Sequence, residues 1–317
     1  MTAGFAAVAR SLRTSVRGRV STDAELAPFT TYRLGGAAAI LVEAEAEEDL
    51  AATALAAEGA GLPVLALGRG SNLLISDAGF AGIVLRLGKG FDWIRAADDD
   101  EEALDAGGAT PLGRLANWAA RRALTGLEFA VAIPATVGGA VRMNAGAHDS
   151  SFAAVLRRAR IYRLGEAAAA DAPAADLGLG YRSTGLGERD IVCAARLHLQ
   201  AGSPQDIAAR MQRYRDHRAA TQPTEPRTAG SMFRNPPPPA PSAGRLIEEC
   251  GLKGFRVGAV EVSPKHANFF VASAGARASQ VHDLLASVQA AVAEATGVVL
   301  VPEVRLVGAF GGPPLRT

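Results

Sequence analysis

The sequence LGRGSNLL, from Leu67 to Leu74, directly follows the apolar segment PVLAL, which is typical of a buried strand. Two glycines flank an arginine, and a serine and an asparagine come next. Because glycine lacks a Cβ atom, the backbone at Gly68 and Gly70 can approach a ligand closely and present its N–H groups to an anion. The segment therefore predicts a ligand-binding turn at the end of a strand.

A second segment of this kind, AIPATVGGAVRMNAGAH, runs from Ala132 to His148. Pro134 stiffens it, Thr136 supplies a hydroxyl, and three glycines again allow a ligand to approach the backbone. Neither segment has the GxGxxG pattern of a Rossmann domain or the GxxxxGK[ST] pattern of a P-loop. One such segment alone is typical of an ordinary tight turn. Two in one chain predict a dinucleotide that is held outside a Rossmann domain.

The hydrophobic pattern along the rest of the chain mixes strands with helices, which indicates an α+β protein. It separates into three regions, and we expect domains at 1–88, 89–203 and 204–317. An Ala-rich interval at 165–180 is expected to be a loop. The expected strands are 39–44, 63–67, 82–87, 157–164, 190–200, 268–273 and 298–307, and the expected helices are 47–59, 111–124, 204–219, 243–252 and 278–296.

Composition excludes several classes of protein. The chain is 49% hydrophobic and 21% charged, which is typical of a packed protein rather than a disordered one. Its 33 basic and 32 acidic residues give a net charge of +1, so no nucleic-acid partner is indicated. No apolar run reaches the roughly 18 residues of a membrane span. Apolar residues at helical spacing from Phe5 to Val16 predict an amphipathic first helix rather than a targeting peptide.

The two cysteines, Cys193 and Cys250, have no CxxC spacing and no histidine at zinc-ligand spacing. No metal site is therefore predicted. A disulfide between them stays open, but a reducing cytoplasm is the simpler interpretation.

The segment AGSMFRNPPPP, from Ala229 to Pro239, places Ser231 just before four prolines. Proline fixes φ and lacks an N–H group, so residues 236–239 cannot lie inside a helix or a central strand. By itself this pattern is typical of a surface turn followed by a rigid linker. Ser231 carries the only hydroxyl group of the segment.

Seven segments, in one order along the chain, resemble the UDP-N-acetylenolpyruvoylglucosamine reductase (MurB) family. The resemblance covers the chain from about Phe29 to Gly308. The direct sequence GLGYRST, with no inserted tyrosine loop nearby, resembles the shorter type of the family. The segments are FTTYRLGG (29–36), LGRGSNLLISDAGFAGIVLRL (67–87), GLEFAVAIPATVGGAVRMNAGAH (126–148), LGLGYRST (177–184), TAGSMFRNP (228–236), GLKGFRVGAVEVSPKHANFFV (251–271) and LVPEVRLVG (300–308).

The resemblance implies a vanillyl-alcohol-oxidase-type FAD-binding fold of two subdomains, followed by an α+β substrate-binding domain. It also implies non-covalent FAD, NADPH as electron donor, and reduction of UDP-N-acetylglucosamine enolpyruvate to UDP-N-acetylmuramate in peptidoglycan synthesis. We expect a cytoplasmic monomer with a UDP-sugar substrate. The expected FAD-binding residues are Gly68, Arg69, Gly70, Ser71, Asn72, Leu73, Pro134, Thr136, Val137, Gly138, Gly139, Asn144 and Gly146.

The same resemblance implies three catalytic residues. Hydride addition to the enolpyruvyl group leaves an enolate-like species that is basic enough for a serine hydroxyl to protonate, and Ser231 is the implied acid. Arg182 offers a planar fork to the substrate carboxylate. Glu303 beside that carboxylate requires either a protonated side chain or a partner such as Arg305. We also expect substrate contacts from Arg218, Asn235, Lys265 and Arg305, and structural roles for His148 and His266.

Two positions depart from the family pattern. Ala135 stands where the family has a glycine after the proline. If that position needs a positive φ, alanine costs about 1–2 kcal/mol there. Ala272 stands where the family has an asparagine, so a polar role at that position is lost.

Other functions stay open on sequence grounds. An alcohol oxidase of the same flavin fold often attaches flavin to histidine or cysteine, and residues 67–80 contain neither. A non-catalytic flavin- or nucleotide-sugar-binding module would not need the three catalytic residues. A serine hydrolase using Ser231, His266 and Glu303 lacks the G-x-S-x-G motif. Without the resemblance, Arg182 reads as a solvated surface charge and Glu303 as an exposed strand position.

Overall fold

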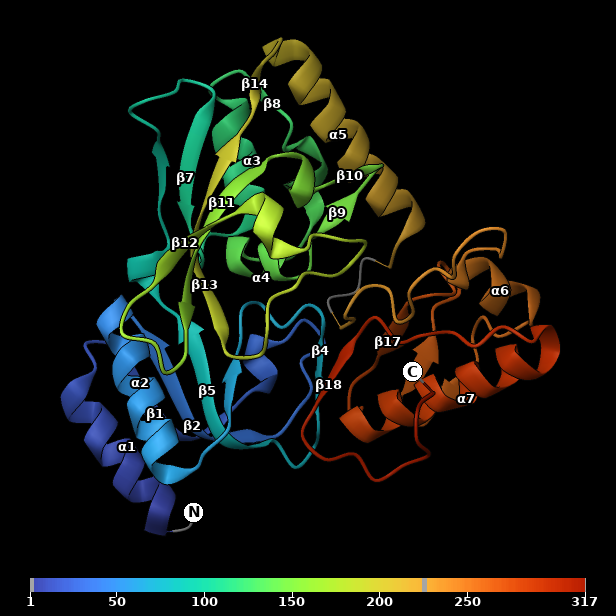
Figure 1. Ribbon diagram of the computed structural model, residues 1–317. Helices are drawn as coiled ribbons and strands as arrows, with labels where there is room; N and C mark the ends of the chain where they lie inside the picture. Colours follow the sequence, from blue (N-terminus) through green and yellow to red (C-terminus); the bar gives the residue numbers. More distant parts are fainter. Residues whose placement is uncertain (1–2, 224–226, 317) are drawn as a thin grey trace. The chain divides into compact units, whose positions relative to one another are not determined.

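The computed structural model describes residues 3–223 and 227–316, and the chain divides into two compact units (Figure 1). The first unit holds the chain up to Ala24 together with residues 39–69 and 81–218. The second unit holds residues 25–38 and 70–80 and the described chain from Ala219 onward. Each unit is therefore built from segments that are far apart in the sequence.

A four-stranded sheet in the order β1-β2-β5-β3 forms one half of the first unit. The helices α1 (Ala3–Ser15) and α2 (Glu47–Ala60) pack against each other, and residues of both belong to one apolar core with β2 and β5. Leu12 of α1, Leu50 of α2 and Ile40 of β2 are fully buried in this core, which confirms the amphipathic first helix. The strands are β1 (Arg19–Glu25), β2 (Ala37–Ala44), β3 (Val64–Ala66) and β5 (Phe80–Leu87).

The other half of the first unit is an antiparallel five-stranded sheet in the order β12-β11-β13-β7-β6. Apolar residues of β7, β11 and β13 form one core with α3 (Leu112–Ala120) and α4 (Val137–Arg142). Leu115 and Val141 are fully buried in it. The strands are β6 (Ile94–Ala96), β7 (Ala103–Gly107), β11 (Leu156–Arg163), β12 (Ala170–Pro173) and β13 (Asp190–His198).

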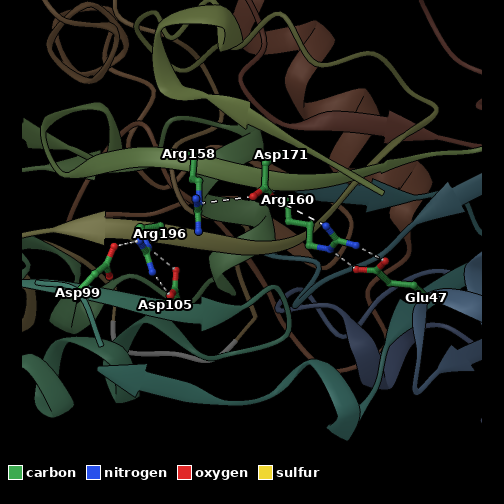
Figure 2. A network of polar contacts seen from close by, with 7 residues as sticks. All are labelled: Glu47, Asp99, Asp105, Arg158, Arg160, Asp171 and Arg196. Carbon is green, nitrogen blue, oxygen red and sulfur yellow. Dashed lines mark hydrogen bonds and ion pairs between the residues drawn. The ribbon is translucent and has the colours of Figure 1, made fainter. Parts of the chain in front are cut away.

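Ion pairs cross the exposed side of this sheet (Figure 2). Arg158 of β11 lies directly opposite Arg196 of β13, a pairing of like charges that is unfavourable on its own. Acidic side chains offset it: Arg196 binds Asp105 at 2.9 Å and Asp99 at 3.0 Å, and Arg158 lies 3.6 Å from Asp171. Each arginine thus has its own acidic partner, which offsets the repulsion between the two guanidinium groups.

The same network reaches α2 (Figure 2). Arg160 donates from Nε and Nη2 to the carboxylate of Glu47 at 2.6 and 2.8 Å and lies 3.9 Å from Asp171. Two parallel bonds of this kind give a well-defined geometry. This pair therefore ties the five-stranded sheet to the helix of the neighbouring half of the first unit.

The second unit contains a three-stranded antiparallel sheet, β15-β16-β17, and a parallel pair of β18 with β4. Its apolar core joins α6 and α7 to these strands, and Val281, Leu285 and Val288 of α7 are fully buried in it. The elements are β4 (Leu73–Ile75), α6 (Ala243–Glu249), β15 (Arg256–Val257), β16 (Val260–Val262), β17 (Phe270–Ala272), α7 (Ala278–Thr296) and β18 (Arg305–Val307).

The helix α5 (Pro204–Thr221) begins in the first unit and ends in the second. No helix within residues 3–223 and 227–316 is long and apolar enough to cross a membrane. Two further pairs of short strands complete the first unit. They are β8 (Leu124–Thr125) with β14 (Gln200–Ala201), and β9 (Gly146–Ala147) with β10 (Ser150–Ser151).

Three sequence expectations about elements were wrong. The expected loop at 165–180 contains β12, whose residues pair with β11. The expected strand at 298–307 is reduced to β18, because Pro302 has no N–H group to continue a ladder. The helix expected over 111–124 ends at Ala120, and Ala123 takes the left-handed conformation (φ 56°) that leads into β8.

Candidate functional site

The two glycine-rich segments meet at one cavity of about 270 Å³ in the first unit. Gly68 and Arg69, just after β3, line one side. Thr136, Gly138 and Gly139, at the start of α4, line the other. A Cβ atom on Gly68 would lie 3.0 Å from Oγ1 of Thr136. The missing side chain therefore brings the two segments together as walls of the same cavity.

Sequence analysis did not predict all residues of the cavity wall. Gly108 follows β7, donates from its N–H group to the carbonyl of Cys193 at 2.6 Å, and accepts from the N–H group of Gly138 at 2.9 Å. The consecutive glycines at 107–108, at the end of a strand, are the signal that could have found it. Sequence analysis also missed the lining residues Ala66, Leu67, Leu85, Arg86, Leu87, Ala109, Pro111, Arg142, Asp190, Ile191 and Val192.

The charged side chains of the cavity wall are Arg69, Arg86, Arg142 and Asp190. Arg86 donates to Glu43 at 3.1 Å, and Arg142 donates to the main-chain oxygens of Gly187 (3.0 Å) and Asp190. Glu43 matches the charge of Arg86, but Arg69 and Arg142, in a wall rich in glycine, suit an anionic ligand that approaches the backbone closely. The cavity therefore fits a ligand that carries phosphate groups.

Asp190, whose side chain is only 2% exposed, is already paired within the protein. It accepts from Nε of Arg163 at 2.7 Å and from the N–H group of Gly187 at 2.8 Å. Burial alone would raise the pKa of Asp190. The bonds from Arg163 and Gly187 and the charge of Arg142 outweigh burial, so the pKa lies below its usual value of 3.8.

Replacing this carboxylate gives a prediction with a defined pH dependence. At pH 7 we expect Asp190→Asn to lower the free energy of unfolding by about 1–3 kcal/mol, because hydrogen bonds to a charged group are lost. Because the pKa of Asp190 is lower in the folded than in the unfolded state, its carboxylate stabilises the folded state at any pH above the unfolded pKa. This stabilisation is lost as the pH falls through the folded pKa. In urea titrations, the difference in free energy of unfolding between wild type and Asp190→Asn should therefore shrink as the pH falls below about 4. Asp176→Asn, at an exposed position, is the control; a gap that persists in acid contradicts the assignment.

The segment 177–184 is tied to the second glycine-rich segment. Arg182 donates from Nη2 to the carbonyl of Gly146 at 2.8 Å, and Asn144 donates from Nδ2 to the carbonyl of Gly180 at 2.8 Å. Both Arg182 (φ 53°) and Asn144 (φ 40°) take the left-handed conformation. For an arginine this costs about 1–2 kcal/mol, and such strain is concentrated at functional sites.

Ser231 and Glu303 lie on neighbouring extended segments of the second unit. Ser231 forms an isolated antiparallel bridge with Phe269, and the N–H group of Met232 donates to the carbonyl of Asn268 at 2.9 Å. On the other side, the N–H group of Glu303 donates to the carbonyl of Met232 at 2.8 Å. Glu303 is thus bonded through the main chain to Met232, the residue that follows Ser231, while Arg182 belongs to the first unit.

The second half of the first glycine-rich segment is bound to Glu303. Asn72 donates from Nδ2 to the carbonyl of Glu303 at 3.1 Å and accepts from the N–H group of Arg305 at 2.9 Å. Gly70 has φ 58°, and a Cβ atom there would lie 2.6 Å from the carbonyl oxygen of Phe29. Only glycine fits this position without a shift of the backbone. Ser71 and Leu73 complete this half, and Leu73 pairs with Arg305 in the parallel ladder.

The four expected substrate-binding residues belong to different elements. Arg218 is half-buried in α5, and burial lowers its pKa. Asn235 accepts from the N–H group of Ala243 at 3.1 Å, at the start of α6. Lys265 donates from Nζ to the carbonyl of Ala219, and the side chain of Arg305 is exposed.

The two departures from the family pattern have a structural explanation. Ala135 does not take a positive φ, so the backbone strain considered for it is absent. Pro134 precedes it, and the N–H group of Ala135 donates to the carbonyl of Ile133 at 2.9 Å. Ala272 is 3% exposed at the end of β17 and packs in the apolar core, where an asparagine would bury a polar group.

The adjacent glycines of α4 allow a matched test of the cavity wall. A Cβ atom on Gly138 would lie 2.9 Å from the carbonyl oxygen of Val192, whereas one on Gly139 would lie 3.5 Å from Oγ1 of Thr136. We expect Gly138→Ala to lower the free energy of unfolding by about 1–3 kcal/mol, because two backbone segments must move apart. Gly139→Ala should be neutral or stabilise by up to about 1 kcal/mol. Denaturant unfolding measures both, and equal effects contradict the described packing.

Val137, between Thr136 and Gly138, is fully buried, and its N–H group donates to the carbonyl of Thr110 at 2.9 Å.

Among the described residues, no group of three or more His, Cys, Asp or Glu side chains is placed to hold a metal ion. Those residues also leave Cys193 and Cys250 as free thiols.

Two family models match the sequence. The model of the C-terminal domain of UDP-N-acetylenolpyruvoylglucosamine reductase matches residues 222–307, and a model described as an FAD-binding domain matches residues 38–163. The chain is 42% identical over 299 residues to the UDP-N-acetylenolpyruvoylglucosamine reductase of Acidiphilium cryptum, covering 94% of both chains. It is 41% identical over 295 residues to that of Rubrobacter xylanophilus, covering 90% of this chain and 94% of the relative.

Solved structures agree with this relationship. The crystal structure of the Thermus caldophilus UDP-N-acetylenolpyruvylglucosamine reductase matches with a TM-score of 0.78 and 35% identity, covering 92% of this chain and 99% of that one. A variant of berberine bridge enzyme matches with a TM-score of 0.50 and 14% identity over 62% of this chain and 44% of that one, which shows a shared fold alone. The predicted α+β fold with an FAD-binding domain is confirmed.

Proposed function

Because the chain belongs to the UDP-N-acetylenolpyruvoylglucosamine reductase family, we propose that it reduces UDP-N-acetylglucosamine enolpyruvate to UDP-N-acetylmuramate, with NADPH as the electron donor. As a member of this family the chain is an FAD-dependent oxidoreductase of peptidoglycan synthesis. The observation that carries the proposal is the relationship itself, which extends over 94% of the chain and of its relative.

The glycine-lined cavity of the first unit fits the diphosphate of FAD. Its wall offers backbone atoms that no side chain covers, and Arg69 and Arg142 contribute positive charge, which a diphosphate requires. Bound FAD supplies the hydride transfer from nicotinamide to the carbon–carbon double bond. The residues proposed to hold it, without a covalent link, are Gly68, Arg69, Gly70, Ser71, Asn72, Leu73, Pro134, Thr136, Val137, Gly138, Gly139, Asn144 and Gly146.

The proposed catalytic residues act on the substrate. Ser231 donates a proton to the carbon of the enolate-like species. Arg182 binds the substrate carboxylate and stabilises the negative charge that develops on it. Glu303 assists the activation of the enolpyruvyl group. The placement of Ser231 and Glu303 on hydrogen-bonded neighbouring segments supports a joint role.

The three-part division of the chain is a further part of the proposal. We assign residues 1–88 and 89–203 to two FAD-binding subdomains, and residues 204–317 to the substrate-binding domain. Three sheets support this assignment, because the four-stranded, five-stranded and three-stranded sheets each fall within one of the three ranges. The pair of β4 with β18 joins the first range to the third, and residues 25–38 and 70–80 belong to the second unit. In the same proposal, Arg218, Asn235, Lys265 and Arg305 contact the UDP-sugar, and the enzyme acts in the cytoplasm as a monomer.

The visible absorption spectrum of the purified protein tests the proposal. Under anaerobic conditions the flavin bands should bleach with NADPH and return only when UDP-N-acetylglucosamine enolpyruvate is added. A protein that stays colourless after incubation with FAD contradicts the assignment of the cavity. Bands that bleach but do not return with this substrate contradict the assignment of the reaction, and rapid return with oxygen after reduction by NADPH favours an oxidase.

A further inference from the structure

The buried side chain of Asn268 holds the main chain next to Ser231. Asn268 is 3% exposed and donates from Nδ2 to the carbonyl of Phe233 at 2.8 Å. Its Oδ1 accepts from the N–H group of the same residue at 3.0 Å. The carboxamide of Asn268 thus bonds to both main-chain polar groups of Phe233, a buried residue two positions after Ser231.

This pairing replaces a strand ladder that is absent here. Ser231 and Phe269 form only an isolated bridge, and the N–H group of Met232 reaches the main chain of Asn268. A carboxamide presents one donor and one acceptor, as a peptide group does, so it extends the pairing by one further residue. The segment that carries Ser231 is therefore aligned by a side chain where main-chain pairing ends.

Within the part of the chain that the structure describes, the nearest main-chain bond that fixes the segment on the other side of Ser231 is four residues away, where the carbonyl of Arg227 accepts from the N–H group of Ala272 at 3.0 Å. Gly230 takes a left-handed conformation (φ 80°), and a Cβ atom built there would meet no atom within 4 Å. Glycine is the most freely rotating residue of the backbone. The pairing that directly follows Ser231, through Met232 and Phe233, therefore contributes to the direction of its hydroxyl group.

We propose that Asn268 is a positioning residue that fixes Ser231 for proton transfer through its two bonds to Phe233. The inference rests on the proposed function. Proton transfer requires donor and acceptor within hydrogen-bonding distance, and a displacement of about 1 Å can slow a reaction 10²-fold. Hydride transfer from NADPH precedes this step and does not use Ser231. A change at Asn268 should accordingly affect one half-reaction and not the other.

Asn268→Asp is the sharpest variant, because it keeps the shape of the side chain. The carboxylate still accepts from the N–H group of Phe233, but it no longer donates to the carbonyl of Phe233. In anaerobic stopped-flow measurements, we expect return of the flavin absorbance with the enolpyruvyl substrate to slow by about 10–100-fold. The rate of bleaching by NADPH should stay within about twofold of the wild-type rate.

Gln289→Glu is the matched control. Gln289 is another buried carboxamide of the second unit, 3% exposed, and it bonds to the main chain of Leu300 and Arg316. The same change of amide to carboxylate should lower stability in both variants, but the control should keep both half-reactions. Equal slowing in the two variants assigns the effect to general destabilisation and overturns the proposal.

A double-mutant cycle with Ser231→Ala separates positioning from a structural role. If Asn268 acts through Ser231, Asn268→Asp should lower the residual rate of the Ser231→Ala protein by less than about twofold. Full additivity of the two changes overturns the proposal. Should the aspartate variant fail to fold, Asn268→Ser, which is smaller and uncharged, replaces it in both measurements. A wild-type protein that never regains its flavin absorbance with the substrate contradicts the proposed function instead.

Discussion

Ser231→Ala is expected to leave bleaching of the flavin by NADPH at the wild-type rate and to slow its return with the enolpyruvyl substrate by about 10²–10⁴-fold, the usual contribution of a general acid. The reason is that the methyl group of alanine has no proton to give. Ser231 precedes Met232, whose carbonyl accepts from the N–H group of Glu303, and no other hydroxyl group occurs in the segment 229–239. Single-turnover stopped-flow absorbance, with each substrate added in turn, measures the two half-reactions separately.

Ser273→Ala is the control for this change, since Ser273 is an exposed serine just after β17 of the same unit. It should behave as wild type in both half-reactions. Equal turnover by Ser231→Ala and wild type removes Ser231 as the proton donor. A Ser231→Ala protein that also loses its flavin points to a structural fault instead, so flavin content is measured on every sample.

Arg182→Gly is expected to slow return of the flavin absorbance by about 10²–10³-fold, the usual effect of losing one group that stabilises developing charge. Its stability should nevertheless stay within about 1 kcal/mol of wild type. Glycine removes the cost of the left-handed conformation at φ 53°, which offsets the lost hydrogen bond to the carbonyl of Gly146. Most substitutions by glycine destabilise a protein, so a stable but slow enzyme is a specific outcome.

Arg182→Lys complements this variant, because it keeps the charge and the strained backbone but lacks the planar fork of donors. We expect it to be slow as well, by about 10-fold or more, and less stable than Arg182→Gly. Denaturant unfolding and the two half-reactions are measured on the same preparations. Wild-type rates in the glycine variant would exclude a catalytic role for Arg182.

The sequence predicted those elements whose pattern is local. The helix expected at 278–296 coincides with α7, since its apolar residues repeat at helical spacing and face one core. The strand β12 was missed because its sequence, ADAP, has no alternation of apolar residues, and only its pairing with β11 makes it a strand. The shortening of the last strand depends on one residue, Pro302.

The candidate site likewise contains residues that the sequence predicts and residues that only the fold brings to it. The glycine-rich segments were visible because glycine itself carries the signal. Residues such as Gly108 and Val192 join the cavity only through the pairing of β7 with β13, which the sequence does not display. Asn268 stood in a segment matched to the family, but its importance depends on which main chain it meets, Phe233, and that is a property of the folded unit.

The interleaving of the two units has a consequence for the order in which the protein can fold during synthesis. All segments of the first unit have been made once Arg218 has left the ribosome. The second unit waits longer, because β4 is made early but its parallel partner β18 is made close to the end of the chain. Gly68 and Arg69 can therefore be in place while Gly70, Ser71 and Asn72 are not. A nascent chain can therefore complete the cavity of the first unit well before the turn at residues 70–72 gains its bonds to Glu303 and Arg305.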